Sequence, residues 1–191
     1  MARLRPRPPT TEAAASPWDT VPGMLSDRPA VHPRQVPPSN TWSEIFDPYT
    51  SAAACLDDPN GSTAVNTALE LWHCHGYDSM GTPQRWYFHG TPIFGANTYM
   101  ITTQANLCVG TPLSSAGPAV GTRVVLVKCT IGPIWTLLSR NAYAGDPVFE
   151  LELGSNTGLC MALPDSSGGN AEPIMLQQCG PGSILRYWML G

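Results

Sequence analysis

Charged residues are scarce in this chain of 191 residues. They account for 13% of it, about half the usual share, and Lys128 is the only lysine. The formal net charge is −4, so the surface has no basic footprint for nucleic acid or for an anionic membrane. This scarcity excludes nucleic-acid-binding proteins as a class and favours a β-rich domain over a helical bundle, which needs charged helix faces.

Long apolar runs and catalytic motifs are also lacking. No run approaches the roughly 18–20 residues of a transmembrane helix. No apolar stretch follows the arginines of the first nine residues, MARLRPRPP, so we expect no signal peptide. We find no G-x-S-x-G, H-E-x-x-H or P-loop motif, and the adjacent Asp57 and Asp58 would not flank a glycosidic bond from opposite sides. We therefore expect no enzyme, no cofactor and no transmembrane segment.

The first 54 residues contain no cysteine, and the first 40 are dominated by proline. This density excludes helix and sheet interiors and favours extended or irregular chain over residues 1–40. Two interpretations stay open: a flexible linker, or an arm that docks along its own domain or a partner subunit. Trp18, Met24 and Leu25 would be the anchors of a docked arm. The prolines are Pro6, Pro8, Pro9, Pro17, Pro22, Pro29, Pro33, Pro37 and Pro38.

From Thr41 onward, short runs rich in β-branched and aromatic residues alternate with Gly, Pro, Asn and Ser. Runs of four to six residues between turn signals are typical of strands. No stretch shows sustained helical periodicity, so the sequence predicts an all-β domain. The clearest predicted strands are Leu69–Trp72, Tyr99–Thr103, Val124–Lys128, Val148–Leu153, Ile174–Gln178 and Tyr187–Leu190.

The six cysteines show an internal repeat. Cys55, Cys108 and Cys160 are 53 and 52 residues apart, and a second cysteine follows each of them after 19, 21 and 19 residues. Fifteen disulfide pairings are possible, but pairing within repeats treats the three units alike. We therefore predict the disulfides Cys55–Cys74, Cys108–Cys129 and Cys160–Cys179, which implies an oxidising location.

A tryptophan follows the second cysteine of each repeat, at Trp86, Trp135 and Trp188. Three four-stranded units cannot bury their apolar faces singly, but they can share a core around a three-fold axis, with these tryptophans near it. A zinc site of Cys74 with His73 and His75 is the competing interpretation of this cysteine. We disfavour it, because neighbouring residues on a strand point to opposite faces, and we predict no metal site.

Paired cysteines and a closing Q-x-W tryptophan in three repeats resemble the ricin B-like (R-type) lectins over residues 41–191. The matching tripeptides are Gln84-Arg85-Trp86, Pro133-Ile134-Trp135 and Arg186-Tyr187-Trp188, so only the first repeat keeps the glutamine. The resemblance implies a β-trefoil of three four-stranded repeats, about 41–90, 91–140 and 141–191, preceded by the extended arm.

The resemblance also implies a sugar pocket in the first repeat. Asp57 takes the place of the carboxylate that binds sugar hydroxyls, and Trp72 that of the aromatic platform. Glu70 and Gln84 take the places of further polar contacts, whereas Pro83 stands where an amide is common. The second repeat has Gly110 and Val127 at the carboxylate and platform positions, and the third has Ala162 and Gln177. We expect these two pockets to be inactive.

The resulting hypothesis is a non-catalytic, galactose-type lectin module for attachment to glycans or cell surfaces, within a larger assembly and outside the cell or on a particle surface. Its expected partners are glycans and a protein subunit that holds the arm. One alternative is a structural or decoration protein of a virion or surface complex, with the trefoil as scaffold. The other is a cell-binding toxin subunit similar to the A subunit of cytolethal distending toxins, which also has a Pro-rich leader before a ricin-like trefoil.

Overall fold

A computed structural model describes most of the chain from residue 39 to its end. The predicted anchors Trp18, Met24 and Leu25, and nearly all of the Pro-rich segment, lie outside the described residues. The described ranges are 39–49, 54–75, 83–114, 116–131, 133–143, 146–154, 156–164, 169–180 and 184–191.

The all-β prediction is confirmed. The only helical segments among the described residues are three-residue 3-10 turns, η1 (Pro59–Gly61), η2 (Pro92–Phe94), η3 (Cys129–Ile131) and η4 (Ile184–Arg186). In the described part of the chain, no helix has the length and apolarity needed to cross a lipid bilayer. The strands are β1 (Thr41–Ser43), β2 (Ile45–Asp47), β3 (Ala54–Asp57), β4 (Glu70–His73), β5 (Trp86–Gly90), β6 (Thr98–Thr102), β7 (Leu107–Gly110), β8 (Val125–Lys128), β9 (Trp135–Tyr143), β10 (Asp146–Leu153), β11 (Leu159–Ala162), β12 (Glu172–Pro173), β13 (Met175–Gln178) and β14 (Met189–Leu190).

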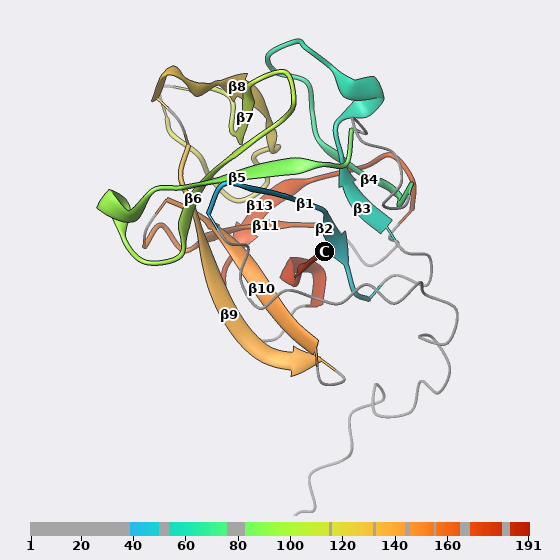
Figure 1. The fold of residues 1–191 in the computed structure, drawn as a ribbon, viewed down its shortest axis with the longest axis vertical. Helices are drawn as coiled ribbons and strands as arrows, with labels where there is room; N and C mark the ends of the chain where they lie inside the picture. The colour runs from blue at the N-terminus through green and yellow to red at the C-terminus, as the bar shows by residue number, and fades with distance from the viewer. Residues whose placement is uncertain are drawn as a thin grey trace, which may run out of the picture.

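Strands from all three repeats close a barrel (Figure 1). Antiparallel pairing runs from β1 through β5, β6 and β9 to β10. A bridge between Phe149 and Trp188 continues it towards β14, and β14 pairs with β2, which follows β1 in the chain. The barrel closes at the level of these pairs, whereas β9 beyond Leu137 pairs with β10 alone among the described strands.

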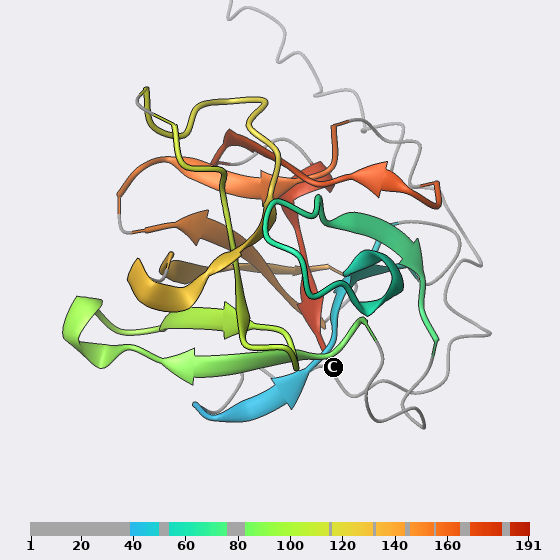
Figure 2. The ribbon, with the colours of Figure 1, turned by 90° about the horizontal axis from the view of Figure 1, so that it is seen from above.

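Three hairpins, β3–β4, β7–β8 and β11–β13, cap one end of this barrel and join one another through the residues before their second strands (Figure 2). The backbone N–H of Leu69 donates to Val124 O at 3.0 Å, Val124 N–H to Ile174 O at 2.9 Å, and Ile174 N–H back to Leu69 O at 3.0 Å. Each of these residues is five positions before the second cysteine of its repeat, and all three are fully buried. This cyclic set of bonds has the three-fold symmetry that the repeat predicted.

The repeated tryptophans join the barrel to the hairpins that cap it. Trp86, Trp135 and Trp188 are buried, with exposed fractions of 0, 0 and 1%. Each indole N–H donates to the carbonyl of the residue that follows the first cysteine of its repeat, at 3.1, 2.8 and 3.0 Å. The predicted core role of these side chains is confirmed, and the indoles also satisfy three buried carbonyls.

All three predicted disulfides are confirmed. Cys55 pairs with Cys74, Cys108 with Cys129 and Cys160 with Cys179, with Cα atoms 5.0, 5.2 and 5.0 Å apart. Each bridge closes its hairpin and fixes the register of the two strands, in loops that contribute about 3 kcal/mol each on the chain-entropy model.

The strand count exceeds the expected twelve for two reasons. The first strand of repeat one divides at Glu44, whose backbone exchanges hydrogen bonds of 3.2 and 3.1 Å with Gly191. Its first half, β1, therefore pairs with β5, and its second half, β2, pairs with β14 and β3. The extra strand β12 exists because Glu172 and Pro173 pair with Leu71 and Glu70 of β4.

Replacing a core indole tests the proposed link between the barrel and its cap of hairpins. Trp135→Phe keeps an aromatic ring but leaves Val109 O buried without its donor and opens a small cavity. We expect the free energy of unfolding to fall by about 2 kcal/mol or more, measured by urea denaturation. Trp42→Phe, at a position 38% exposed, is the control, with an expected change below about 0.5 kcal/mol. Equal effects of the two substitutions would contradict the assigned role.

Candidate functional site

The register of the first hairpin brings three of the four predicted site residues to one face. Asp57 of β3 is directly opposite Glu70 of β4, and Cys55 is opposite Trp72. Directly opposed side chains lie on the same face of a sheet, as do residues two apart on one strand. Asp57, Glu70 and Trp72 are therefore neighbours on the outer face, whereas Leu56 and the fully buried residues beside it point into the core.

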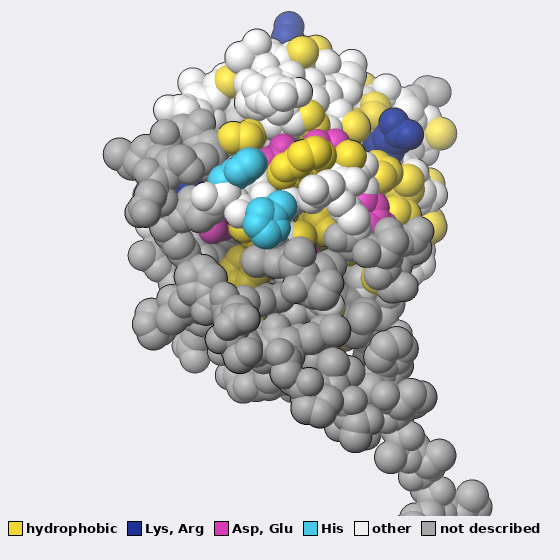
Figure 3. Space-filling view, turned by 90° about the vertical axis from the view of Figure 1, so that its right-hand side faces the viewer, with side chains coloured by type: hydrophobic (Ala, Val, Ile, Leu, Met, Phe, Trp, Pro, Cys, Tyr) yellow, Lys and Arg dark blue, Asp and Glu magenta, His cyan; other side chains and the backbone are white. Residues whose placement is uncertain are grey.

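These side chains differ in their exposure to solvent. Asp57 is 4% exposed, Glu70 and Trp72 are half-buried, and His73 and His75 are exposed. On the side of the molecule that carries β3 and β4, histidine, acidic and hydrophobic side chains gather together (Figure 3). The outer face thus combines an aromatic surface with a nearly covered carboxylate.

Gln84, the fourth predicted site residue, is fully buried and bonded to the protein. Its Oε1 accepts from the backbone N–H of His75 at 2.8 Å, and its Nε2 donates to His73 O at 3.0 Å. These bonds fix the chain on both sides of Cys74. The amide also donates to the Asp57 carboxylate, so Gln84 connects the carboxylate to the end of β4.

Burial gives the acidic residues of this hairpin unusual electrostatics. It raises the pKa of Asp57 above its ordinary value, although the Gln84 hydrogen bond and the nearby His75 act in the opposite direction. Burial and the Asp57 charge also raise the pKa of Glu70. Asp57 Oδ1 has no hydrogen-bond partner among the described residues. A buried acceptor without a partner is uncommon in folded proteins.

The adjacent Asp58 is 2% exposed and more strongly perturbed. Burial, together with the neighbouring Asp57 charge, raises its pKa to about 6, against the lowering effect of a hydrogen bond from the Ser62 backbone. Its own backbone N–H donates to Pro83 O at 3.0 Å. Asp58 therefore ties the start of the η1 turn to the segment that precedes Gln84.

Two residues outside the predicted sugar site also support this face. His75 lies close enough to Asp57 to lower its pKa. Asn170, from the third repeat, accepts from the His73 backbone N–H through Oδ1 at 2.9 Å. A repeat pattern contains the signal that neighbouring repeats meet, but it does not say which side chain of one repeat reaches the next.

The second repeat has no room for a side chain at the position of the carboxylate. A Cβ atom on Gly110 would meet Pro133 Cγ at 2.6 Å and Val127 Cγ2 at 2.9 Å. Real Cβ atoms essentially never make contacts this short. The proline that replaces the Q-x-W glutamine therefore packs directly onto the position where the first repeat carries its carboxylate.

The third repeat places Ala162 and Gln177 at the two positions. Ala162 is fully buried, and Gln177 Nε2 donates to Leu163 O at 3.3 Å. The described residues of this face do not include a carboxylate beside an aromatic ring.

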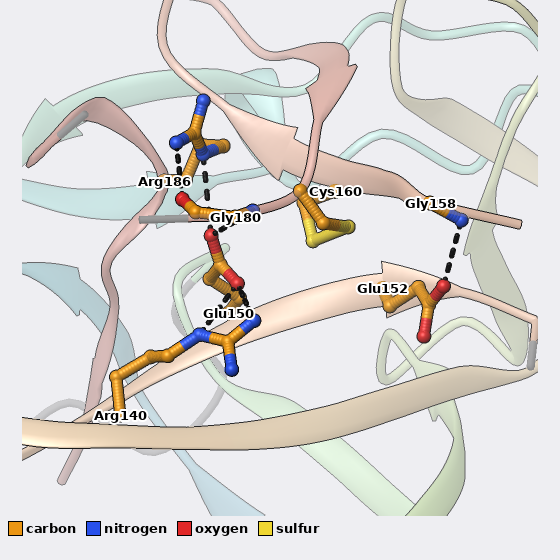
Figure 4. Close-up of polar contacts among 8 residues, drawn as sticks. Arg140, Glu150, Glu152, Gly158, Cys160, Gly180 and Arg186 are labelled. Atoms are coloured by element: carbon orange, nitrogen blue, oxygen red, sulfur yellow. Dashed lines mark hydrogen bonds and ion pairs between the residues drawn. A yellow bond between two sulfur atoms is a disulfide. The ribbon is translucent and has the colours of Figure 1, made fainter. Parts of the chain in front are cut away.

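An ion pair in the third repeat replaces the missing glutamine. Glu150, fully buried, accepts through Oε1 from the Gly180 backbone N–H at 3.0 Å, as Gln84 does from His75. Arg186, at the Q-x-W glutamine position, donates to the same Oε1 at 3.2 Å and to Gly180 O. Arg140 approaches Glu150 from β9 and donates to Oε2 through Nε at 2.7 Å (Figure 4). The polar groups here are bonded to one another and hold the end of β13.

The residues of the disfavoured zinc site are held otherwise. Cys74 is bonded to Cys55, which leaves no thiolate for a metal. Within the described ranges, no group of three or more His, Cys, Asp or Glu side chains is placed to hold a metal ion.

Comparison with known proteins places these features in a family. A model of the ricin-type beta-trefoil lectin domain matches residues 43–188. A comparison with curated proteins finds no match.

Solved structures share the fold at low identity. A ricin B-like lectin of Macrolepiota procera in complex with lactose is 17% identical, with a TM-score of 0.62 over 81% of this chain and 96% of that one. The Rhizoctonia solani agglutinin is 16% identical, with a TM-score of 0.62 over 81% and 97%. The Haemophilus ducreyi cytolethal distending toxin is 17% identical, with a TM-score of 0.56 over 83% and 88%. The β-trefoil prediction is confirmed.

The raised pKa of Asp58 predicts how stability changes with pH. In the unfolded chain this carboxyl ionises near its ordinary 3.8, and in the folded chain at about 6. Its stabilising contribution is thus full below pH 3.8 and is lost as pH rises through 6. Asp58→Asn does not titrate, so it should gain stability relative to the wild type between pH 4 and pH 7, by up to about 3 kcal/mol. Urea denaturation midpoints of both proteins at four pH values measure this difference. If the midpoints of the two proteins change with pH in parallel, the prediction is refuted.

Arg186→Gln tests the ion pair of the third repeat. This change introduces the family glutamine but leaves the buried Glu150 with only Arg140, so we expect a loss of about 3 kcal/mol in unfolding free energy. Adding Glu150→Gln should recover part of this loss, because the buried carboxylate that has lost one of its two arginines is then neutral. Thermal and urea unfolding of the single and double variants would show the recovery, and purely additive losses would argue against the pair.

Proposed function

Because the chain belongs to the ricin-type β-trefoil lectin family, we propose that it is a non-catalytic module that binds galactose-type sugars through its first repeat. Family membership supports carbohydrate binding in general, and domains of this kind are generally binding modules without catalysis. The choice of repeat and of sugar is our proposal.

One observation carries the choice of repeat. Among the described residues of the three equivalent faces, only those of the first combine a carboxylate, Asp57, with an aromatic ring, Trp72, on neighbouring strands. In the second repeat Pro133 packs against Gly110, and in the third the corresponding positions hold Ala162 and Gln177.

The chemistry of a pyranose fits this pair. Its apolar C–H face can stack on Trp72, and its hydroxyls can donate to a carboxylate beside the ring. A hydroxyl that reached Asp57 Oδ1 would satisfy an acceptor without a partner among the described residues. Asp57 is only 4% exposed, so this hydroxyl would take a buried position next to Trp72.

Glu70 and Gln84 have different roles in this proposal. Glu70 is half-buried on the same face as Trp72 and can accept from a second hydroxyl. Gln84 is fully buried and bonded to the backbone on both sides of Cys74. We assign it to holding Asp57 and the end of β4 in place.

The three disulfides fit an oxidising environment outside the cell or on a surface. We propose that the module attaches a larger assembly to glycan-bearing surfaces, with the Pro-rich residues 1–40 tethering it to a partner protein. A cell-binding toxin subunit is the second candidate, favoured by the Pro-rich leader that precedes the trefoil. A virion or particle decoration protein would use the same tether with the trefoil as a scaffold.

Glycan binding by Asp57→Asn tests the site. A single sugar site of this kind should bind in the millimolar range, about −4 kcal/mol, so the array is probed with a multivalent form of the protein. We expect the wild-type protein to bind galactose-terminated glycans, and Asp57→Asn to weaken this binding about tenfold or more.

The matched control is Asp58→Asn, which makes the same change at the next residue, beyond the end of β3, and should keep binding. Binding that survives Asp57→Asn would refute the first-repeat site. Binding of the wild-type protein only to glycans without galactose would refute the galactose assignment.

A further inference from the structure

A row of aromatic side chains lies on the outer face of β1 and β5, away from the first-repeat site. Along β5 the side chains alternate, so Trp86 and Phe88 are buried in the core whereas Tyr87 and His89 face outward. Trp42 of β1 is directly opposite Tyr87. It is 38% exposed, although a tryptophan of this size usually buries more of its surface.

These rings form the wall of a groove. The Trp42 and Tyr87 centroids are 5.1 Å apart with the ring planes at 69°, and those of Tyr87 and His89 are 4.5 Å apart at 59°. The groove has a volume of about 240 Å³ and is completed by Thr102, Thr103, Gln104 and Asn106. β1, β5 and β6 lie side by side in both ribbon views (Figures 1 and 2).

The opposite rim is polar and built on a fixed turn. Thr103 and Asn106 close the β6–β7 turn through a 3.1 Å backbone hydrogen bond, and Thr103 N–H donates to Leu107 O at 2.8 Å. The side-chain amides of Gln104 and Asn106 are exposed and bond to no other described residue. His89 Nε2 and Thr102 Oγ1, 3.1 Å apart, hold the ring against the rim.

We propose that this groove is a second carbohydrate site, which takes one neutral pyranose ring. Angled aromatic rings can contact the C–H groups of a sugar, and the two free amides supply both donors and acceptors for its hydroxyls. None of the described lining residues is Lys, Arg, Asp or Glu, so these residues offer no counter-charge for an acidic sugar. Its volume is below the roughly 300–1,000 Å³ of pockets for drug-sized ligands and suits a single ring.

A Pro-rich strand is the competing occupant, because proline rings also dock on aromatic grooves. Such a strand offers chiefly carbonyl acceptors, whereas both Gln104 and Asn106 present acceptors as well as donors. The sugar uses both, and we therefore favour it.

This site is separate from that of the proposed function. It uses β1, β5 and the β6–β7 turn, whereas the first-repeat site uses β3 and β4. Either can fail without the other.

NMR titration of the full chain tests the proposal. The methyl glycosides of galactose, glucose, mannose and N-acetylglucosamine are added in turn, and the indole N–H of Trp42 and the backbone amides of Tyr87 and Asn106 are followed. We expect at least one glycoside to shift these signals in a saturable manner with a millimolar Kd. The shifts should persist in Asp57→Asn, which separates this site from the first-repeat site.

Variants of the groove supply the controls. Trp42→Ala should weaken the titration about tenfold or more, and Gln104→Ala, on the opposite rim, should weaken it without touching the sheet. Phe94→Ala removes an aromatic ring that is 54% exposed outside the groove and should change nothing. Three results would each overturn the proposal. The first is that no glycoside shifts the groove signals, and the second is that the shifts are lost in Asp57→Asn. The third is that Gln104→Ala leaves the titration unchanged. Shifts produced only by a synthetic peptide of residues 25–38 would instead make the Pro-rich segment the occupant.

Discussion

The structure depends on a ring of three backbone hydrogen bonds in which Leu69, Val124 and Ile174 each donate to the next. No single repeat can make this ring, because every donor and acceptor in it comes from a different repeat. Buried backbone groups without partners are costly, so the three hairpins are stable only when they meet. The barrel, the disulfide-closed hairpins and the indole bonds then follow the same symmetry. This is why the fold needs three repeats even though we assign sugar binding in this cap to one of them.

The symmetry of the scaffold contrasts with the way each repeat solves one local problem. The backbone after the second cysteine needs a partner near the barrel wall. Gln84 serves His75 in the first repeat, and Glu150 serves Gly180 in the third with the help of two arginines. In the second repeat the Q-x-W glutamine position holds Pro133, which has no polar side-chain group and packs against Gly110. The glutamine, the ion pair and the apolar plug therefore occupy related places, and the carboxylate beside an aromatic ring survives only where the glutamine does.

Much of this was predictable from spacing, and some of it was not. The nearly regular intervals between cysteines predicted the disulfide pairing and the core tryptophans, because equivalent residues in a symmetric fold have equivalent neighbours. The resemblance to the lectin family implied that Asp57 and Trp72 lie together, and the register of β3 and β4 brings them to one face. The burial of Gln84 was not predictable, since a glutamine in the sequence is compatible both with an amide that binds a sugar and with one that binds the backbone. Nor was the division of the first strand at Glu44, which depends on its bonds to the distant Gly191.

The sequence by itself determined the all-β class, the three-fold repeat and the disulfides, whereas the residues of the first-repeat face came from the resemblance to the ricin B-like lectins. The first three are local or periodic features, and a period is visible without coordinates. Only the tertiary structure decided which polar groups remain accessible, because accessibility depends on what other repeats place on top of them. It buried Gln84 and Glu150, filled the second pocket with Pro133, and left Trp42 and Tyr87 at the surface beside a turn from the next repeat. Contacts between segments far apart in the chain have no period, and so they are absent from the sequence pattern.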